Sequence, residues 1–311
     1  MVNKLKSTPT IQLPEKKKRH ELFGSVKPGP KTKPTIKEHM SDVQNLKKDF
    51  LFDIDAVGIS NVKHPIIVNS ELDPTSQTTV GTFQLTSTID KWSKGTNMSR
   101  FLEQLNESGK SGLTIDFSTL KTFVISLKSR LKQQNIDVEV TFPWFYERKG
   151  PNTDLAGMNH ADVCLRVHYD EKFGFQWKAS LSVFVTTLCP CSKEISEYSA
   201  HSQRGKVSME IIFNDDFDDT VVDWKKELLE AAESNASAQI YPVLKRPDEK
   251  IVTEKAYENP RFVEDLVRLV AADLYELSFV QTFKVTCQNE ESIHMHDAVA
   301  SLSFNKQTDK I

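Results

Sequence analysis

Two periodicities divide the chain into predicted strands and helices. Strands are predicted where apolar side chains alternate with polar ones or where β-branched residues gather. Helices are predicted where apolar side chains recur every three or four residues. The predicted strands cover residues 55–68, 78–89, 136–142, 163–167, 173–187, 206–213, 279–287 and 297–304. The predicted helices begin near residue 96 and near residue 116, and then cover residues 219–234 and 259–277.

The order of the predicted elements is repeated. Each half of the chain is expected to run strand, strand, helix, helix, strand, strand. This order favours an α+β fold of two duplicated units, in which antiparallel sheets are covered by layered helices. We expect an arm at 1–40, a first unit at 41–170 and a second unit at 171–311. In the second unit, Asn259 is predicted as the N-cap of the last helix, with Pro260 at its first position.

Composition is that of a globular protein. Of the 311 residues, 38% are hydrophobic and 27% are charged, and no run reaches the roughly 20 apolar residues of a membrane span. The positively charged start of the chain is not followed by the apolar block of a secretory signal. We therefore expect a cytoplasmic protein that does not engage a membrane. Four cysteines are too few for a disulfide framework, so the thiols are expected to be free.

Charge is distributed unevenly along the chain. Residues 1–39 contain ten Lys or Arg residues, three Glu residues and five Pro residues, although the whole chain has a net charge of −3. This composition predicts a flexible or loosely docked arm. The basic run at residues 16–19 suits either a solvated tail or contact with an anionic partner, and we favour the solvated tail. The remaining, acidic part argues against nucleic-acid binding.

The tripeptide Cys189-Pro190-Cys191 carries the strongest chemical signal. It contains two of the four cysteines and follows a predicted strand. In an extended chain, side chains two residues apart point to the same side, so both thiols can serve one site. Pro190 is expected to end the strand pairing. Thiolates are good ligands for zinc, so a metal site is the leading interpretation and buried structural cysteine is the alternative.

Histidines and carboxylates add the other ligand types of a mixed metal site. His201 follows the cysteines closely, and either a ligand or an ordinary surface histidine fits its surroundings. His294 and His296 precede the last predicted strand, and a hairpin would bring them towards the cysteines. Glu290 and Glu291 are interpreted either as solvated turn residues or as groups that bind or orient a metal.

Basic side chains near these residues suggest phosphate binding. They are Lys193, Arg204 and Lys206 after the cysteines, and Lys245, Arg246 and Lys250 further along the chain. Such groups neutralise phosphates through charge-assisted hydrogen bonds, although charged loops are often only solvated. The chain lacks a glycine-rich Walker loop, which argues against a P-loop nucleotide hydrolase.

Several motifs in order along the chain resemble one enzyme family. They are LCPCSKEIS at 188–196, AHSQR at 200–204, LKRPDEKIVTEKAYENPRFVED at 244–265, ESIHMH at 291–296 and KGTNMSRF at 94–101. Together they resemble GTP cyclohydrolase IB, the prokaryotic alternative to the type IA enzyme. The resemblance covers about residues 41–304. Gly205 departs from it, because a small polar residue is expected there, and the basic arm is longer than expected.

The resemblance implies a fold, an assembly and a reaction. The fold is the tunnelling fold, whose tandem units assemble into an oligomeric barrel. Members of the family are homotetramers with active sites at subunit interfaces. They convert GTP and water to formate and 7,8-dihydroneopterin triphosphate, the first step towards tetrahydrofolate. The resemblance therefore implies a hydrolase that acts on a cyclic amidine.

The resemblance also implies roles for individual residues. Cys189, His201 and Glu249 are expected to bind a divalent metal ion, for which zinc, manganese and ferrous iron all suit the ligand types. Glu264 is expected to anchor guanine by accepting two hydrogen bonds from it. The expected catalytic residues are Cys189, Cys191, Glu291, His294 and His296. The expected phosphate-binding residues are Lys193, Arg204, Lys245 and Arg246.

Two other functions remain open at this stage. Related tunnelling-fold enzymes reduce a deazapurine nitrile or process pterins, although the chain lacks a recognisable nicotinamide-binding signature. The other alternative is a non-catalytic protein in which Cys189 and Cys191 store zinc or undergo oxidation. Turnover of GTP separates both from the leading hypothesis.

Overall fold

The computed structural model describes residues 13–24 and 34–310, which fall into two compact units. The described part of unit 1 belongs to Met1–Val57 and Thr88–Thr96, and unit 2 comprises Gly58–Ser87 and Asn97–Ile311. Within residues 13–24 and 34–310, no helix is long and apolar enough to cross a membrane.

Unit 1 contains part of the predicted basic arm. Within that arm, Lys16–Phe23 forms helix α1 and Lys37–His39 forms the 3-10 helix η1. Residues 46–50 run beside residues 91–94, and the N–H of Phe50 donates to the carbonyl of Lys91 at 2.7 Å. The predictions for residues 1–12 and 25–33 lie outside the described residues.

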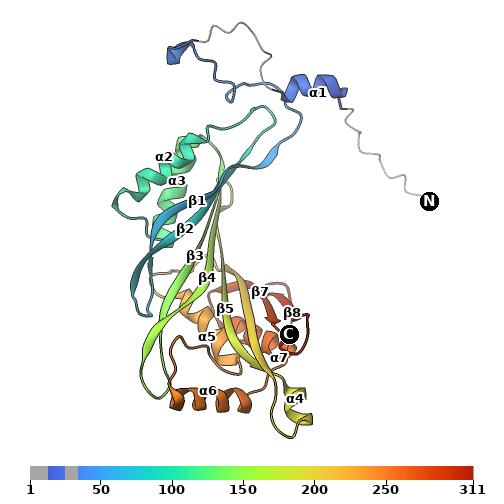
Figure 1. Cartoon of the computed structure of the whole chain (residues 1–311). Coiled ribbons are helices and arrows are strands. Elements are labelled where there is room, and N and C mark those ends of the chain that lie inside the picture. The colour runs from blue at the N-terminus through green and yellow to red at the C-terminus, as the bar shows by residue number, and fades with distance from the viewer. Residues whose placement is uncertain (1–12, 25–33, 311) are drawn as a thin grey trace, which may run out of the picture. The chain divides into compact units, whose positions relative to one another are not determined.

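Eight strands form one sheet in the order in which they occur along the chain (Figure 1). Each strand from β2 to β7 pairs antiparallel with the next. Each predicted strand is confirmed, with ends that differ by a few residues. The strands are β1 Ile54–Asn69, β2 Ser76–Ile89, β3 Asn135–Lys149, β4 Ala156–Asp170, β5 Gly174–Leu188, β6 Ser202–Phe213, β7 Val280–Asn289 and β8 Ala298–Asn305.

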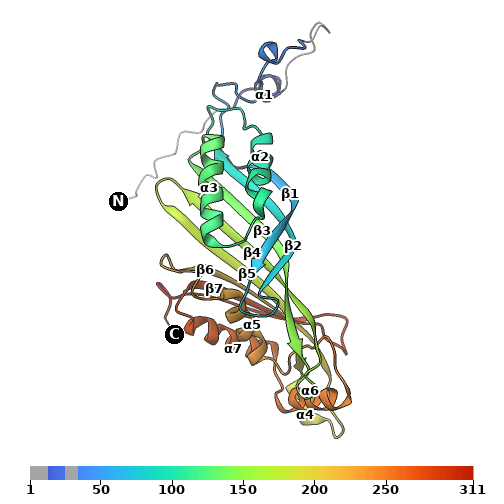
Figure 2. The same ribbon diagram turned by 90° about the vertical axis from the view of Figure 1, so that its left-hand side faces the viewer.

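Helices lie in several of the connections between strands. One set lies between β2 and β3, a short helix lies between β5 and β6, and another set lies between β6 and β7. The two helix sets of unit 2 lie on the same face of its sheet (Figure 2). The helices are α2 Ser99–Ser108, η2 Gly109–Ser111, α3 Phe117–Leu131, α4 Pro190–Ile195, α5 Trp224–Asn235, α6 Arg246–Glu258 and α7 Val263–Glu276.

The helix-covered face of the sheet holds the hydrophobic core. Alternate side chains of each strand point to this face, which is why the strand periodicity is visible in the sequence. Phe123 and Leu127 of α3 and Leu266 and Val270 of α7 are buried here with the inward residues of the strands. Phe117 stacks on Trp177 with ring centroids 3.9 Å apart. The predicted order of strands is confirmed, but the second half differs from the prediction because α4 lies between β5 and β6 and a third helix, α6, lies between β6 and β7. The division at residue 170 stays a prediction.

Two helix starts in the second half of the chain differ from the sequence-based expectation. The last helix begins at Val263 with Phe262 as its N-cap, whereas Asn259 ends α6 by donating to the carbonyl of Lys255 at 3.2 Å. The predicted N-cap at Asn259 is therefore wrong, because the residue closes one helix before another begins. Likewise α5 starts at Trp224, where the carboxylate of Asp223 caps it.

The Cys-Pro-Cys segment is helical and not extended. Cys189 is the N-cap of α4, Pro190 occupies its first turn, and Cys191 lies inside the helix. Proline suits this position because the first N–H groups of a helix have no partner within it. The two thiols therefore do not share one side of a strand, and the expectation based on extended backbone is wrong.

Candidate active site

Three of the predicted site residues lie where adjacent strands of the sheet end. Cys189 directly follows β5, His201 directly precedes β6, and Glu291 lies just beyond the end of β7. The strand register brings these ends level, because Leu188 pairs with Ser202 and Gly205 pairs with Asn289. Residues that are distant in sequence are thus placed side by side.

Cys189 is fixed by the main chain around it. Its N–H donates to the carbonyl of His201 at 3.1 Å, and its Sγ accepts from the N–H of Ser192 at 3.5 Å. The sulfur therefore lies at the N-terminus of α4. Cys191 is exposed, whereas Cys189 is half-buried.

His201 lies between the cysteine turn and β7. Its N–H donates to Ser192 Oγ at 3.2 Å, which connects it to α4. Its ring Nδ1 is 3.0 Å from Gln203 Oε1 and 3.9 Å from Glu291 Oε2. The side chains of His201 and Glu291 are only 15% and 14% exposed, so their interaction is shielded from water.

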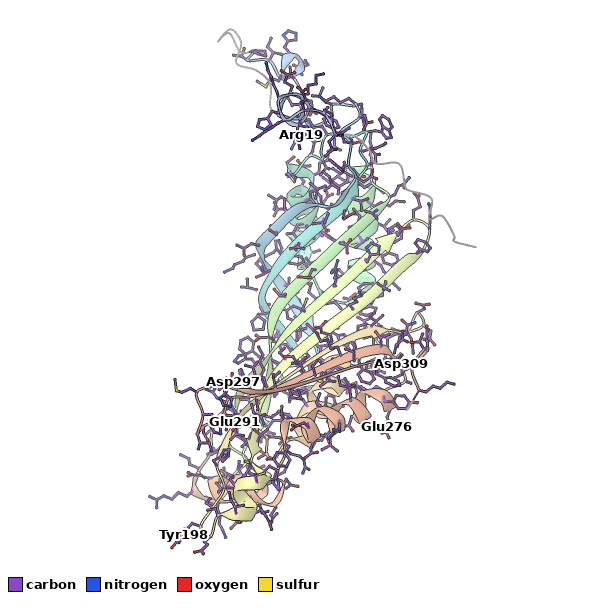
Figure 3. The ribbon with its side chains drawn as sticks, turned by 90° about the vertical axis from the view of Figure 1, so that its right-hand side faces the viewer. Arg19, Tyr198, Glu276, Glu291, Asp297 and Asp309 are labelled. Atoms are coloured by element: carbon purple, nitrogen blue, oxygen red, sulfur yellow. The ribbon has the colours of Figure 1, made fainter. Side chains whose placement is uncertain are left out.

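The connection between β7 and β8 carries the second histidine pair. His294 and His296 stack on each other with ring centroids 4.9 Å apart, and both are exposed. The start of the connection is held against β6, because the N–H of Glu290 donates to the carbonyl of Arg204 at 2.9 Å. Glu291 and Asp297 lie at this end of the sheet (Figure 3).

The predicted phosphate-binding residues occupy two places. Lys193 donates to the carbonyl of Tyr257 at 2.6 Å and lies over its ring, so it ties α4 to α6. Arg204 is exposed and 3.7 Å from Glu290. Lys245 and Arg246 begin α6 and are exposed.

The two predicted carboxylates outside the strand ends lie on exposed helix starts. Glu249 is in the first turns of α6 and Glu264 is in the first turn of α7. The segment between these helices passes beside the cysteine turn, because the N–H of Arg261 donates to the carbonyl of Leu188 at 2.9 Å. The structure thus brings the start of α7 to the same end of the sheet as Cys189.

A layer of polar residues lies one step deeper in the sheet. Thr187, Gln203 and Asn289 are 0%, 9% and 2% exposed, and each lies two residues from Cys189, His201 or Glu291. No pattern along the chain singles these three residues out. Gly205 belongs here too, since a Cβ atom at this position would lie 2.9 Å from Asn289 Oδ1 and from Thr187 Cγ2. Close packing accounts for glycine where a polar residue was expected.

Comparison with protein families identifies the chain. A model described as type I GTP cyclohydrolase folE2 matches residues 40–300. The chain belongs to the FolE2 family of type I GTP cyclohydrolases. The matched range includes every residue assigned above to a metal, a substrate or catalysis.

Named FolE2 relatives cover nearly the whole chain. GTP cyclohydrolase FolE2 of Oceanobacillus iheyensis is 60% identical over 301 residues, which are 97% of this chain and 100% of the relative. GTP cyclohydrolase FolE2 of Bacillus subtilis is 52% identical over 301 residues, covering 96% of this chain and 98% of the relative.

The fold of this FolE2 chain is shared with a protein of very different sequence. A uricase from Bacillus fastidious aligns with a TM-score of 0.50 at 8% identity, over 81% of this chain and 93% of the uricase. The resemblance concerns the fold alone and confirms an α+β architecture of the tunnelling type.

The residue types at this FolE2 site fit a divalent metal ion, although the described residues do not gather a complete ligand set. Residues with thiol, imidazole and carboxylate groups lie at neighbouring strand ends, and zinc, manganese and ferrous iron accept such a mixture of ligands. Among the residues that the structure describes, no three Cys, His, Asp or Glu side chains converge as metal ligands. Glu249 in particular is not brought to Cys189 and His201 within the described chain.

Proposed function

We propose that this chain opens the imidazole ring of the guanine base of GTP by hydrolysis, which yields formate and 7,8-dihydroneopterin triphosphate. The supporting observation is the placement of Cys189, His201 and Glu291 at the ends of three adjacent strands in a chain of the FolE2 family. We further propose that the product supplies tetrahydrofolate synthesis.

The proposed cofactor is one divalent cation, zinc, manganese or ferrous iron, with Cys189, His201 and Glu249 as its protein ligands. When bound, such an ion acts as a Lewis acid and makes water a stronger nucleophile at neutral pH. Cys189 suits the role because its Sγ is held in place by the N–H of Ser192 and because sulfur is a good ligand for such ions.

Ring opening and loss of formate need several proton transfers. We assign them to Cys191, Glu291, His294 and His296, which surround the strand ends or lie on the connection after β7. Imidazole groups suit this work because their ordinary pKa is near neutrality, so they both give and take protons. Exposure of the two stacked histidines leaves them free to meet a substrate that enters from solvent.

Recognition of the nucleotide is assigned to charged groups on the helix starts. Glu264 accepts hydrogen bonds from N1 and the exocyclic amine of guanine, a pattern that adenine does not offer. Arg204, Lys245 and Arg246 neutralise the triphosphate, and Lys193 assists from α4. Because Lys193 is already held by Tyr257, its proposed part includes fixing α4 against α6.

We propose a homotetramer whose active sites lie at the interfaces. Exposed apolar side chains support this, since Ile195 ends α4, Tyr198 follows it, and Ile293 and Met295 lie between β7 and β8. Figure 3 shows Tyr198 at the far end of the β5–β6 connection. A second copy of the chain that covers these side chains would also be able to supply Glu249, the proposed ligand that does not reach Cys189 and His201 within the described chain.

The free thiols fit a reducing compartment, and we propose that the protein is located in the cytoplasm.

The proposal is tested by incubating the purified full chain with GTP after loading with zinc, manganese or ferrous iron in separate samples. We expect a product that becomes a fluorescent neopterin after oxidation, with at least one of the metals. Cys189→Ala is expected to abolish product while retaining the circular dichroism of the fold. Absence of product with all three metals would contradict the proposal.

A further inference from the structure

The structure points to a residue that positions the proposed metal ligand His201. We propose that Gln203 holds the imidazole of His201 in the tautomer that leaves Nε2 as a free lone pair. The inference rests on the proposed function, because the orientation of the His201 ring matters for catalysis only if His201 binds the proposed metal ion. It adds a residue that neither the sequence motifs nor the family name assigns to the site.

The position of Gln203 suits this role. It lies in β6, two residues after His201, and its side chain is 9% exposed. Its Oε1 is 3.0 Å from His201 Nδ1, which is a normal hydrogen-bond length. Since the strand fixes the backbone of Gln203, its amide presents a fixed acceptor beneath the histidine.

The surroundings of the ring decide which nitrogen carries the proton. Neutral imidazole has one N–H group and one lone pair. Two oxygen atoms lie near Nδ1, from Gln203 at 3.0 Å and from Glu291 at 3.9 Å, and both attract a proton to that nitrogen. Nε2 then keeps its lone pair, which is the form that binds a metal ion. Histidine ligands commonly donate their other N–H in this way.

The rest of His201 is held by the main chain. Its N–H donates to Ser192 Oγ, and its carbonyl accepts from the N–H of Cys189 at 3.1 Å. These bonds place the residue but leave rotation of the ring free. The contact with Gln203 is the shortest polar contact recorded for the ring in the described chain, so it selects the ring orientation.

Gln203 belongs to a buried polar layer and is not an isolated polar residue of the core. Thr187 Oγ1 and Asn289 Oδ1 in the same layer are buried and find no hydrogen-bond partner in the described part of the chain. Unpaired buried polar atoms cost stability, so a sheet built only for stability would carry apolar residues here. Such a buried polar layer is expected where its side chains hold the residues of the adjacent active site in place.

Substitutions at position 203 separate an acceptor role from packing. Gln203→Leu has a similar size but offers no acceptor, whereas Gln203→Glu keeps an oxygen in the same place. Gln203→Asn withdraws the acceptor by one methylene and serves if the leucine variant does not fold. Gln176→Leu, on exposed β5 surface, is the matched control.

The experiment measures the dissociation constant of Co²⁺ from visible absorption and chelator competition in each full-length variant. We expect Gln203→Leu and Gln203→Asn to bind Co²⁺ about 10- to 100-fold more weakly. Gln203→Glu and Gln176→Leu are expected to match the unaltered chain. In parallel, we expect kcat for GTP to fall in Gln203→Leu while KM for GTP is unchanged, because Gln203 is buried away from the substrate.

The outcomes distinguish this inference from the proposed function. If the unaltered chain binds Co²⁺ and turns over GTP while Gln203→Leu and Gln203→Asn do so equally well, the inference is overturned and the function stands. Equal weakening by Gln203→Glu and Gln203→Leu also overturns it, because packing would then be the cause. If the unaltered chain neither binds Co²⁺ nor turns over GTP, the proposed function fails and the inference with it.

Discussion

The carboxylate of Asp248 in α6 accepts a hydrogen bond from the main-chain N–H of Asn152, in the turn between β3 and β4, at 2.8 Å. The same carboxylate accepts from the N–H of Thr153 at 2.9 Å and from the N–H of Lys245 at 3.0 Å. Asp248 is completely buried. It therefore fixes the start of α6, where Lys245, Arg246 and Glu249 are placed, against a hairpin of the sheet.

We expect Asp248→Ala to raise KM for GTP several-fold and to lower the melting temperature. The variant leaves the N–H groups of the turn without their acceptor, so the start of α6 is no longer held. Steady-state kinetics and a thermal melt measure the two effects. Glu254→Ala, on the exposed side of the same helix, is the control and is expected to change neither. An unchanged KM in Asp248→Ala would show that the start of α6 does not serve substrate binding.

Asp223 holds another hairpin in the same manner and predicts a dependence of stability on pH. It accepts from Ser70 Oγ at 2.6 Å and from the N–H of Glu71 at 2.9 Å, and it pairs with Lys225 at 2.6 Å. Burial acts to raise the pKa of Asp223, but the Lys225 ammonium and the hydrogen bonds outweigh it and lower the pKa below its ordinary value. The ionised carboxylate therefore stabilises the folded chain.

The stabilisation is expected to be complete above the ordinary pKa of aspartate, about 4, and to be lost as the pH falls through the lower folded-state value. Asp223→Asn should reduce the free energy of unfolding at pH 7 by about 3–5 kcal/mol, because Lys225 is left buried and unpaired. Urea unfolding from pH 7 downwards measures the difference, which should shrink below about pH 4. Glu71→Gln removes only an exposed pair and is the control. A difference that is constant with pH would contradict the assignment.

Gly205→Ala tests the packing beneath the site. The added methyl group would meet Asn289 and Thr187 at 2.9 Å, which requires both buried side chains to shift. We expect a loss of about 1–3 kcal/mol in the free energy of unfolding and lower GTP turnover, since Asn289 is two residues from Glu291. Gly95→Ala is the control because a methyl group there would lie 3.9 Å from its nearest neighbour. Full stability and activity of Gly205→Ala would contradict the close packing described.

Glu264→Gln tests recognition of guanine. Replacing one carboxylate oxygen by an amide removes an acceptor and presents a donor to the base. We expect KM for GTP to rise at least about tenfold, the effect of losing one charged hydrogen bond, while the melting temperature is unchanged because Glu264 is exposed. Glu276→Gln, exposed at the other end of α7, is the control. An unchanged KM would remove Glu264 from the proposed binding site.

Much of the fold was predictable because the strands bury one face. Alternation places Val138 and Val140 inward, and the pattern remains visible along the chain. Helix α6 was missed for the opposite reason, since only Asp248 and Ala256 are buried in it and it shows no apolar stripe. Helix α4 has six residues, too few for a periodic pattern to emerge.

The site was predictable only where residue type reveals chemistry. Cysteine and histidine at Cys189 and His201 attract attention because few side chains bind metals. Gln203 carries no such signal, and its relation to His201 depends on a strand direction and a burial pattern that the sequence does not state. The hydrogen bond between Asn152 and Asp248 likewise joins the turn between β3 and β4 to the first turn of α6. These segments are distant in sequence, and they come together only in the assembled fold.

The most direct test of the central claim is release of formate from C8 of guanine. GTP with a radioactive carbon at C8 is incubated with the metal-loaded full chain, and labelled formate is separated and counted beside neopterin. We predict one labelled formate for each neopterin formed, and neither product with Cys189→Ala. Absence of labelled formate with the unaltered chain, or equal release by Cys189→Ala, would contradict the claim.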